Sequence, residues 1–274
     1  MLINLFLSFV LGVIEGVTEW LPVSSTGHML LFDEFFALGV SPEFLEMFLV
    51  VIQLGAVLAV VVLRFRPLAA PVLPGVPAAE RRRSLRLWGK ILISCVPAAV
   101  IGLLFDDRIN ALFFNAPTIC AALFVYGAVF IFLELGRKNI AAQCDSVFEV
   151  PVKTAVFIGL FQLLALIPGT SRSGATIIGA MLFGCSRSAA TEYTFYLAVP
   201  VMAGAGLLKL LKFGFAFTHG ELAVLAAGCV TAFLVSVFAI RFLTGFVKRH
   251  SFTGFGAYRI ALALAVAAVW FLRK

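Results

Sequence analysis

The chain has 274 residues, of which 62% are hydrophobic and only 13% are charged, and its mean hydropathy is +1.08. Soluble domains contain about 45–50% apolar and about 25% charged residues, so this composition excludes a water-soluble globular protein. The formal net charge of +7 does not indicate a nucleic-acid-binding surface, because the basic residues lie at the ends of apolar runs, where they reflect membrane topology.

The first segment, residues 3–37, is apolar but interrupted by polar residues. Pro22 and Gly27 bracket a Ser-Ser-Thr run, and each half of the segment is too short to cross about 30 Å of hydrocarbon at about 1.5 Å per residue. We therefore predict a re-entrant hairpin, in which a helix enters the membrane, breaks near the midplane and returns.

The spans that follow are long apolar runs separated by polar linkers. They are predicted at 44–64, 88–105, 117–136, 190–212, 221–244 and 255–272. Between the third and the fourth, residues 153–184 repeat the opening pattern: an apolar helix reaches Pro168-Gly169, a polar TSRSGAT stretch follows, and a second half-helix ends near Gly184. This segment is the second predicted re-entrant hairpin.

The two interrupted segments match at their polar and glycine positions when the chain is shifted by 147 residues. The shift pairs Gly12 with Gly159, Glu15 with Gln162, Ser24 with Ser171, Ser25 with Arg172, Thr26 with Ser173 and Gly27 with Gly174. A single membrane domain, 1–274, is thus predicted to contain two repeats, 1–136 and 153–272. Because each repeat holds three spans, an odd number, the second must be inverted, and the hairpin tips meet near the midplane.

The predicted fold class is therefore an all-α integral membrane protein with six full spans and two re-entrant hairpins. Its orientation follows from the basic residues of the 65–90 linker and from Arg137, Lys138, Lys248 and Arg249, which fall on one side of this topology. That side is predicted to be cytoplasmic, so the first hairpin opens to the outer face of the membrane.

Glu15 and Glu19 are one helical turn apart, so their side chains project from one face. Two carboxylates at membrane depth repel each other unless a cation or a shared proton relieves them. A divalent cation, Mg²⁺ or Ca²⁺, is the expected cofactor because both ions prefer oxygen ligands. The alternative is a protonated pair that forms hydrogen bonds to neighbouring helices.

Ser24, Ser25 and Thr26 lie at the break before a half-helix that starts near Gly27. Their hydroxyls can cap this helix, and its free N–H groups can hold an anion. A serine with a nearby base is also the usual arrangement for nucleophilic attack, and His28 is a candidate base or acid. Simple capping and a structural hydrogen bond from the histidine are the alternatives.

Arg172 follows Pro168-Gly169 and stands between Ser171 and Ser173, which with Thr176 supply further donors. A guanidinium stays charged at any accessible pH, and its fork matches phosphate oxygens. We expect it to bind phosphate; an internal salt bridge to one of the two glutamates is the alternative.

The remaining polar residues of the spans are attributed to snorkelling or to bonds between helices; they are Gln53, Glu134, Glu192, Arg241 and Arg259. The five cysteines form no CxxC pair and are predicted to be small buried hydrophobic residues.

EGVTEWLPVSSTGH (15–28) and PGTSRSGAT (168–176) resemble the two signature regions of the bacterial undecaprenyl-diphosphate phosphatase family, which is also known for bacitracin resistance. The resemblance extends along the chain and includes IQLGAVLAVV (52–61) and EYTFYLAVP (192–200). It implies a membrane phosphatase that removes the terminal phosphate of a C55 prenyl diphosphate and regenerates the lipid carrier of cell-wall synthesis.

The resemblance also implies roles for single residues. Glu15 and Glu19 match the essential acidic pair, Ser25 the proposed nucleophile, His28 the motif histidine and Arg172 the phosphate-binding arginine. We expect Ser25, His28, Glu19 and Arg172 to be catalytic. The same arginine, Ser171, Ser173, Thr176, Ser24 and Thr26 are expected to bind phosphate, and the two glutamates to hold the metal. Attack by Ser25 and attack by an activated water both remain open.

Two rivals share parts of this pattern. The alternative function is a prenyl-phosphate flippase or transporter, which would be built on the same inverted-repeat fold. A second lipid phosphatase superfamily is disfavoured because neither His219 nor His250 starts an HxxxD pattern. The expected partners are the prenyl diphosphate and the membrane, with no nucleic acid. The oligomeric state is open and includes a homodimer.

Overall fold

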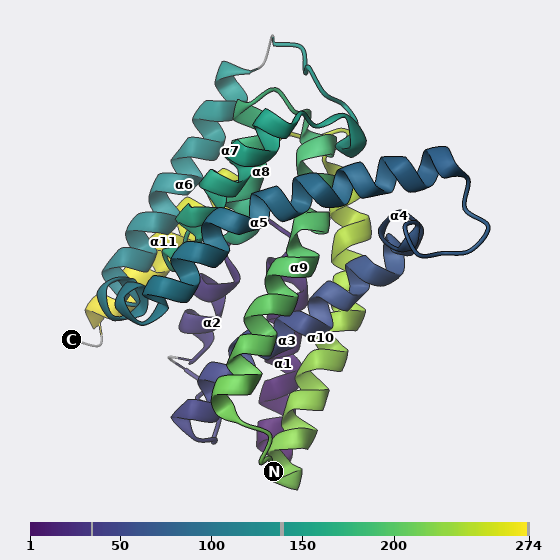
Figure 1. Ribbon diagram of the computed structural model, residues 1–274. Coiled ribbons are helices and arrows are strands. Elements are labelled where there is room, and N and C mark those ends of the chain that lie inside the picture. Colours follow the sequence, from purple (N-terminus) through teal and green to yellow (C-terminus); the bar gives the residue numbers. More distant parts are fainter. Residues whose placement is uncertain (34, 138–139, 273–274) are drawn as a thin grey trace.

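The computed structural model describes residues 1–33, 35–137 and 140–272, and within these ranges the protein is built from helices (Figure 1). The α-helices are α1 (Leu2–Thr18), α2 (Ser25–Asp33), α3 (Pro42–Leu63), α4 (Phe65–Ala69), α5 (Ala78–Phe113), α6 (Ala116–Gly136), α7 (Val152–Gln162), α8 (Arg172–Leu182), α9 (Arg187–Phe213), α10 (His219–Phe246) and α11 (Thr253–Leu272). Two short 3₁₀ helices, η1 (Val147–Glu149) and η2 (Leu163–Leu166), flank α7. Lys138, which contributed to the predicted orientation, lies outside the described residues.

Six of the described helices are long and apolar enough to cross a membrane, namely α3, α5, α6, α9, α10 and α11. Their outward surfaces carry exposed apolar side chains such as Leu103, Phe132 and Phe238, which suit a hydrocarbon environment. The chain is therefore an all-helical, multi-pass membrane protein, and the six predicted spans are confirmed.

One boundary differs from the prediction. The polar stretch before the second span was predicted to be a linker up to residue 86, but α5 already begins at Ala78. Its first residues, AAERRRSLRL, are good helix formers, and the last proline of the preceding stretch, Pro77, comes just before the helix. The arginines of this segment therefore lie on a rigid helix that is continuous with the span.

The two interrupted segments are each a pair of short helices, α1 with α2 and α7 with α8. Both breaks are built in the same way. Ser24 and Ser171 have φ values of +73° and +72° and are the two described non-glycine residues with positive φ. Each serine hydroxyl accepts a hydrogen bond from the N–H three residues later, at 3.3 Å from Gly27 and 3.2 Å from Gly174. Left-handed backbone at a residue other than glycine is uncommon and costs energy, so both helix starts share one strained cap.

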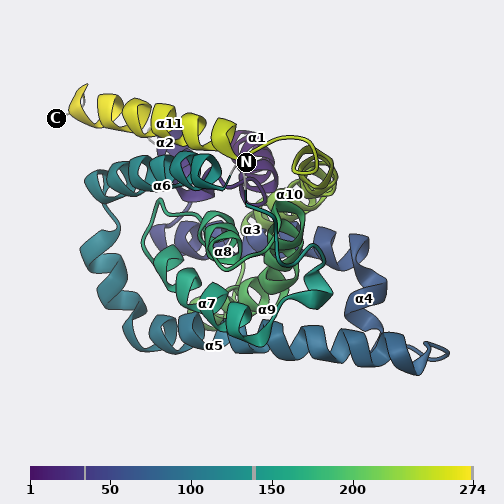
Figure 2. The ribbon, with the colours of Figure 1, turned by 90° about the horizontal axis from the view of Figure 1, so that it is seen from above.

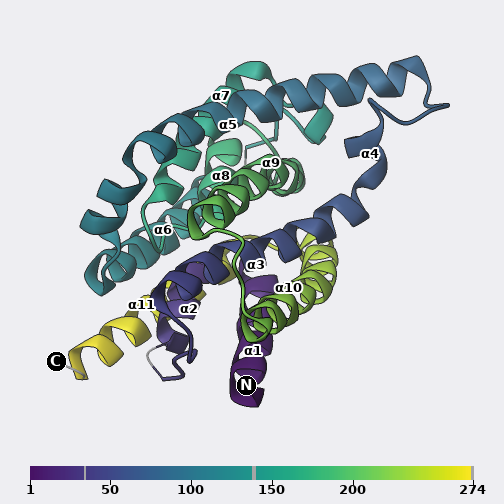
Figure 3. The same cartoon turned by 60° about the horizontal axis from the view of Figure 1, so that its bottom comes forward.

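Of the short helices, α8 is enclosed by the longer ones. Figure 2 shows α8 near the centre of the bundle, and most of its side chains are buried. Figure 3 shows α5 with α7 on one side and α1 with α10 on the other, with α3 and α9 between them, in agreement with the helix contacts. The remaining long pair, α6 with α11, packs beside α2 and α8.

Two glycines set how closely the short helices approach the spans. A Cβ at Gly12 would lie 2.7 Å from the carbonyl oxygen of Gly228, and a Cβ at Gly159 would lie 2.7 Å from that of Ser94. Both distances are shorter than any ordinary contact, so neither position has room for a side chain. The pairs α1–α10 and α7–α5 are therefore held in contact backbone to backbone.

Candidate active site

The carboxylate of Glu19 joins the two helix breaks. Glu19 follows the last residue of α1 and is almost completely buried. Its Oε2 accepts a hydrogen bond from Ser25 Oγ at 3.2 Å, and its Oε1 accepts one from Arg172 Nε at 3.1 Å. Ser25 from the first break and Arg172 from the second therefore meet on the two oxygens of one carboxylate, which is also how they would meet on one phosphate.

Arg172 is fixed by three groups. Besides the bond from Nε, its Nη2 lies 3.0 Å from the same Glu19 oxygen, and Nη1 donates to the carbonyl oxygen of Thr194 at 3.1 Å. The ring of Trp20, which is fully buried, lies 6.0 Å from the guanidinium carbon. The internal salt bridge, which was the alternative to phosphate binding for Arg172, is thus present in the structure, and Glu19 supplies its carboxylate.

The hydroxyls around Arg172 already have partners. Ser171 caps α8, and its Oγ lies 3.1 Å from Ser173 Oγ, which also donates weakly to the carbonyl oxygen of Leu21 at 3.4 Å. Thr176 is fully buried and lies 2.8 Å from the hydroxyl of Thr194. Ser171 and Ser173 therefore contact each other at the start of α8, whereas Thr176 joins α8 to α9.

Glu15 lies one turn before Glu19 in α1 and is fully buried. Neither of its carboxylate oxygens has a hydrogen-bond partner among the described residues. An ionised carboxylate buried without a partner is costly, so this side chain suits either a proton or a bound cation. Within the described ranges no group of three or more His, Cys, Asp or Glu residues could hold a metal. A cation on the two glutamates would have to take its other ligands from water or phosphate.

Both ring nitrogens of His28 contact groups other than Ser25. Its Nδ1 lies 2.7 Å from the carbonyl oxygen of Ser24 and therefore donates, which leaves Nε2 to accept from the hydroxyl of Tyr258 at 2.7 Å. The two rings are stacked, with centroids 5.6 Å apart. Both ring nitrogens of His28 are thus used to join the first break to α11. The neighbouring Thr26 is half-buried beside it.

Arg259 also belongs to the site, although its sequence position predicted only snorkelling or an ordinary bond between helices. Its side chain is 0% exposed, and it donates to the carbonyl oxygens of Pro22 at 3.2 Å and of Gly169 and Thr170 at 2.9 Å each. One guanidinium therefore holds the backbones of both breaks together. The only sequence signal was an arginine within a span that has no acidic residue in its own helix.

Two other polar residues of the spans form the expected bonds between helices. Glu134 pairs with Arg187 and also accepts from the backbone N–H of Phe252 at 2.9 Å, and Glu192 pairs with Arg64 at 3.3 Å. These contacts lie at helix ends and leave the helix breaks to Glu15, Glu19 and the two arginines described above.

Fold and site together define a multi-pass membrane protein in which one buried carboxylate, Glu19, links two broken helix pairs. Residues 8–265 match the family model described as bacitracin resistance protein BacA. The chain belongs to this family.

Curated relatives agree with this assignment over nearly the whole chain. A protein named undecaprenyl-diphosphatase from Enterococcus faecalis (strain ATCC 700802 / V583) is 50% identical over 270 residues, which cover 97% of this chain and 98% of the relative. One of the same name from Acetivibrio thermocellus is 51% identical over 265 residues, 97% of each chain. A protein named undecaprenyl-diphosphatase 1 from Clostridium acetobutylicum is 51% identical over 271 residues, 98% of each chain. The family resemblance of the two motifs is confirmed.

Proposed function

We propose that the protein hydrolyses undecaprenyl diphosphate to undecaprenyl phosphate and inorganic phosphate. This reaction recycles the lipid carrier of peptidoglycan synthesis and confers bacitracin resistance. The observation that carries the proposal is the meeting of Ser25 and Arg172 on the Glu19 carboxylate, inside a protein with six apolar spans. The names of relatives that share half of its residues support the same activity.

Substrate binding begins at Arg172. Its Nε and Nη2 both face Glu19 Oε1. This edge of the guanidinium is therefore directed at the place where we expect the substrate phosphate to bind, which we call the anion position. The terminal phosphate of the substrate takes the place of the carboxylate on this edge, while Nη1 stays on the carbonyl oxygen of Thr194 and keeps the side chain in place. The capped starts of α2 and α8 add backbone N–H groups to the anion position.

Ser25 Oγ then attacks the terminal phosphorus, and the bond from that phosphorus to the bridging oxygen breaks, so that undecaprenyl phosphate leaves. Glu19 is the base that takes the serine proton, because it is the group to which Ser25 already donates. A water molecule cleaves the phosphoserine, inorganic phosphate departs and Ser25 regains its proton. Positioning and neutralisation of charge supply most of the rate enhancement in such phosphoryl transfers.

A divalent cation would be held by Glu15 and Glu19, and when bound it would supply further positive charge to the phosphate oxygens. The orphaned oxygens of Glu15 support this assignment. A chelator should therefore lower phosphate release by the wild-type protein, and added Mg²⁺ or Ca²⁺ should restore it. Phosphate release that is indifferent to a chelator would contradict the cation and leave Glu15 as a protonated group.

His28 has a supporting part in this mechanism. Since Nδ1 donates to the Ser24 carbonyl oxygen and Nε2 accepts from Tyr258, the ring fixes the backbone just before Ser25. In this role it orients the nucleophile, and the proton of Ser25 goes to Glu19.

The finer features of the fold belong to the same proposal: two re-entrant hairpins, 3–37 and 153–184, in inverted repeats 1–136 and 153–272 of one membrane domain. The matched strained caps at Ser24 and Ser171, 147 residues apart, support it. So does the exchange of partners, since α1 packs on α10 whereas α7 packs on α5, and α2 meets α11 whereas α8 meets α6. By the positive-inside rule the site opens to the outer face of the inner membrane.

The test is release of phosphate from a prenyl diphosphate by purified protein in detergent. Without a membrane there are no two compartments, so an enzyme still turns over, whereas a flippase has no reaction to perform. Ser25→Ala and Arg172→Ala should abolish release. Ser251→Ala should not, because the hydroxyl of this serine donates to nearby Thr253 and lies outside the site. Retention by the arginine variant of more than about a tenth of the activity, a loss below about 1.4 kcal/mol, would contradict its central role.

The covalent intermediate has its own test. After acid quench during turnover, mass spectrometry of wild-type protein should find a phosphorylated peptide that contains Ser25, and the alanine variant should lack it. Turnover without a phosphorylated peptide at any time point, together with activity in Ser25→Ala, would assign the attack to a water molecule instead.

A further inference from the structure

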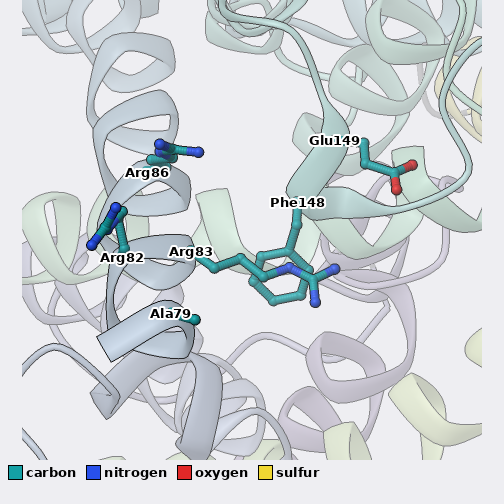
Figure 4. A pocket seen from close by; sticks show the side chains of 6 residues that line it. All are labelled: Ala79, Arg82, Arg83, Arg86, Phe148 and Glu149. Carbon is teal, nitrogen blue, oxygen red and sulfur yellow. The ribbon is translucent and has the colours of Figure 1, made fainter. Parts of the chain in front are cut away.

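A pocket lies away from the helix breaks, between the first turns of α5 and the short helix η1. It has a volume of about 590 Å³ and is lined by Ala79, Arg82, Arg83, Arg86, Phe148 and Glu149. Figure 4 shows Arg82 and Arg86 on the helix side of this pocket and Arg83 extended across the ring of Phe148. Its guanidinium carbon lies 4.0 Å from the ring centroid. We call this cavity the arginine pocket.

The arginine pocket has an excess of positive charge. Three guanidiniums and one carboxylate line it, and none of these four groups forms an ion pair with a residue in the described ranges. Arginines just outside the pocket are different: Arg66 pairs with Glu80, and Arg81 donates to the carbonyl oxygen of Leu73. The pocket arginines are thus the part of this basic segment that has free donors for an anion.

The pocket also lies at the head of an apolar surface. Arg86 is six residues, or about 9 Å, before Leu92 along α5, and Leu92 and Val96 are more than half exposed. α7 packs beside α5 and carries the exposed side chains of Val156 and Leu160. Positive side chains that give way to exposed apolar side chains within two turns mark the boundary between water and hydrocarbon.

We propose that the arginine pocket binds the phosphate group of an anionic phospholipid, whose acyl chains lie on the exposed apolar surfaces of α5 and α7. Guanidiniums bind phosphate oxygens through paired hydrogen bonds, and basic pockets at membrane helices are suited to lipid head groups. The apolar surface is the reason for choosing a lipid over free phosphate, which would gain nothing from it. This site is separate from the one that binds the prenyl diphosphate, so it does not depend on the proposed hydrolysis.

The test is native mass spectrometry of the purified protein titrated with phosphatidylglycerol, phosphatidylcholine or glycerol 3-phosphate. Of these three ligands, we expect only phosphatidylglycerol to bind tightly. The double variant Arg82→Gln/Arg86→Gln should bind it with at least tenfold lower affinity. Arg108→Gln, at the other end of the same helix, is the matched control and should bind like wild type. Glu149→Gln removes the one acidic group of the pocket and should bind more tightly.

Three results would overturn the proposal. Equal affinity of the double variant and wild type would place the lipid elsewhere, and equal affinity for phosphatidylcholine would remove the need for negative charge. Equal affinity for glycerol 3-phosphate would make the pocket a site for free phosphate anions. Because the pocket arginines are exposed, the double variant should fold. An unchanged thermal midpoint of the double variant, together with tighter lipid binding by Glu149→Gln, shows that the loss of binding comes from the pocket and not from unfolding.

Discussion

Replacement of Arg259 should damage the site by releasing the backbones of its two helix breaks. Arg259→Met removes three hydrogen bonds and leaves the carbonyl oxygens of Pro22, Gly169 and Thr170 buried without this donor. Bonds from a charged donor contribute about 1.5–3 kcal/mol each, so three give about 5–9 kcal/mol before the cost of burying the guanidinium. That cost is several kcal/mol, which leaves a net loss of stability of about 3–5 kcal/mol.

The effect on turnover should exceed what lower stability alone would cause. Without the bridge the two breaks are free to separate, and a shift of about 1 Å between reacting groups costs about 100-fold in rate. Arg259→Lys keeps the charge, but one ammonium cannot reach both breaks as the fork does, so it should regain part of the stability while kcat stays low. Thermal unfolding and kcat with saturating prenyl diphosphate, both at a temperature where the variants are folded, separate the two effects.

Arg241→Met is the matched control, because Arg241 is an arginine within a span whose side chain is exposed. It should change neither the thermal midpoint nor kcat appreciably. If folded Arg259→Met keeps kcat within threefold of wild type, the hydrogen bonds from Arg259 contribute to stability alone and not to turnover. If Arg259→Lys restores full turnover, a positive charge is enough and the forked shape of the guanidinium is not needed.

Three further predictions rest on single contacts. Glu19→Gln should lower turnover by more than about 100-fold, because the base is lost. The same variant should bind inorganic phosphate more tightly in calorimetry, because no carboxylate then competes for Arg172. Weaker phosphate binding would contradict this role of Glu19. Gly159→Ala should destabilise the protein by about 1–3 kcal/mol in thermal unfolding, because its Cβ would lie 2.7 Å from the Ser94 oxygen. Gly204→Ala, which meets no atom within 4 Å, should be neutral or stabilising, and equal effects of the two would refute the packing argument. Burial raises the pKa of the Cys185 thiol to about 12, so at pH 8 it stays protonated and should react with maleimide only after unfolding; rapid labelling of the folded protein would exclude this.

The parts of the structure that could be predicted from sequence are those with a local cause. Pro22 and Pro168-Gly169 cannot continue a regular helix, and a serine follows each, so the two breaks were predicted by local chemistry alone. The shift of 147 residues then paired Ser24 with Ser171, and the structure gives both the same strained backbone. The spans were equally predictable, because length and hydropathy decide them.

The contacts that the sequence could not predict are tertiary. An arginine in a span is compatible with snorkelling, with an ion pair or with backbone carbonyls, and only the packing of α11 against the breaks selects the last for Arg259. The ring of His28 is close to Ser25 in sequence, yet Tyr258, 230 residues away, determines which way it faces. The early start of α5 has another cause, because the charged residues that follow Pro77 are good helix formers and extend the span toward its N-terminus.

Glu19 has two partners in the resting protein, and this explains why the site needs so many charges. Its carboxylate neutralises Arg172 while the site is without substrate, so the buried guanidinium is never left without an anion. In the proposed mechanism a phosphate takes that place, and Glu19 keeps its bond from Ser25 and becomes free to accept the proton. Glu15, one turn earlier in α1, has no hydrogen-bond partner among the described residues, and two adjacent buried carboxylates repel each other. Arrival of substrate would therefore create the demand for a cation or a proton at the moment when the serine has a proton to give, so that binding of the diphosphate and activation of Ser25 would be parts of one electrostatic exchange.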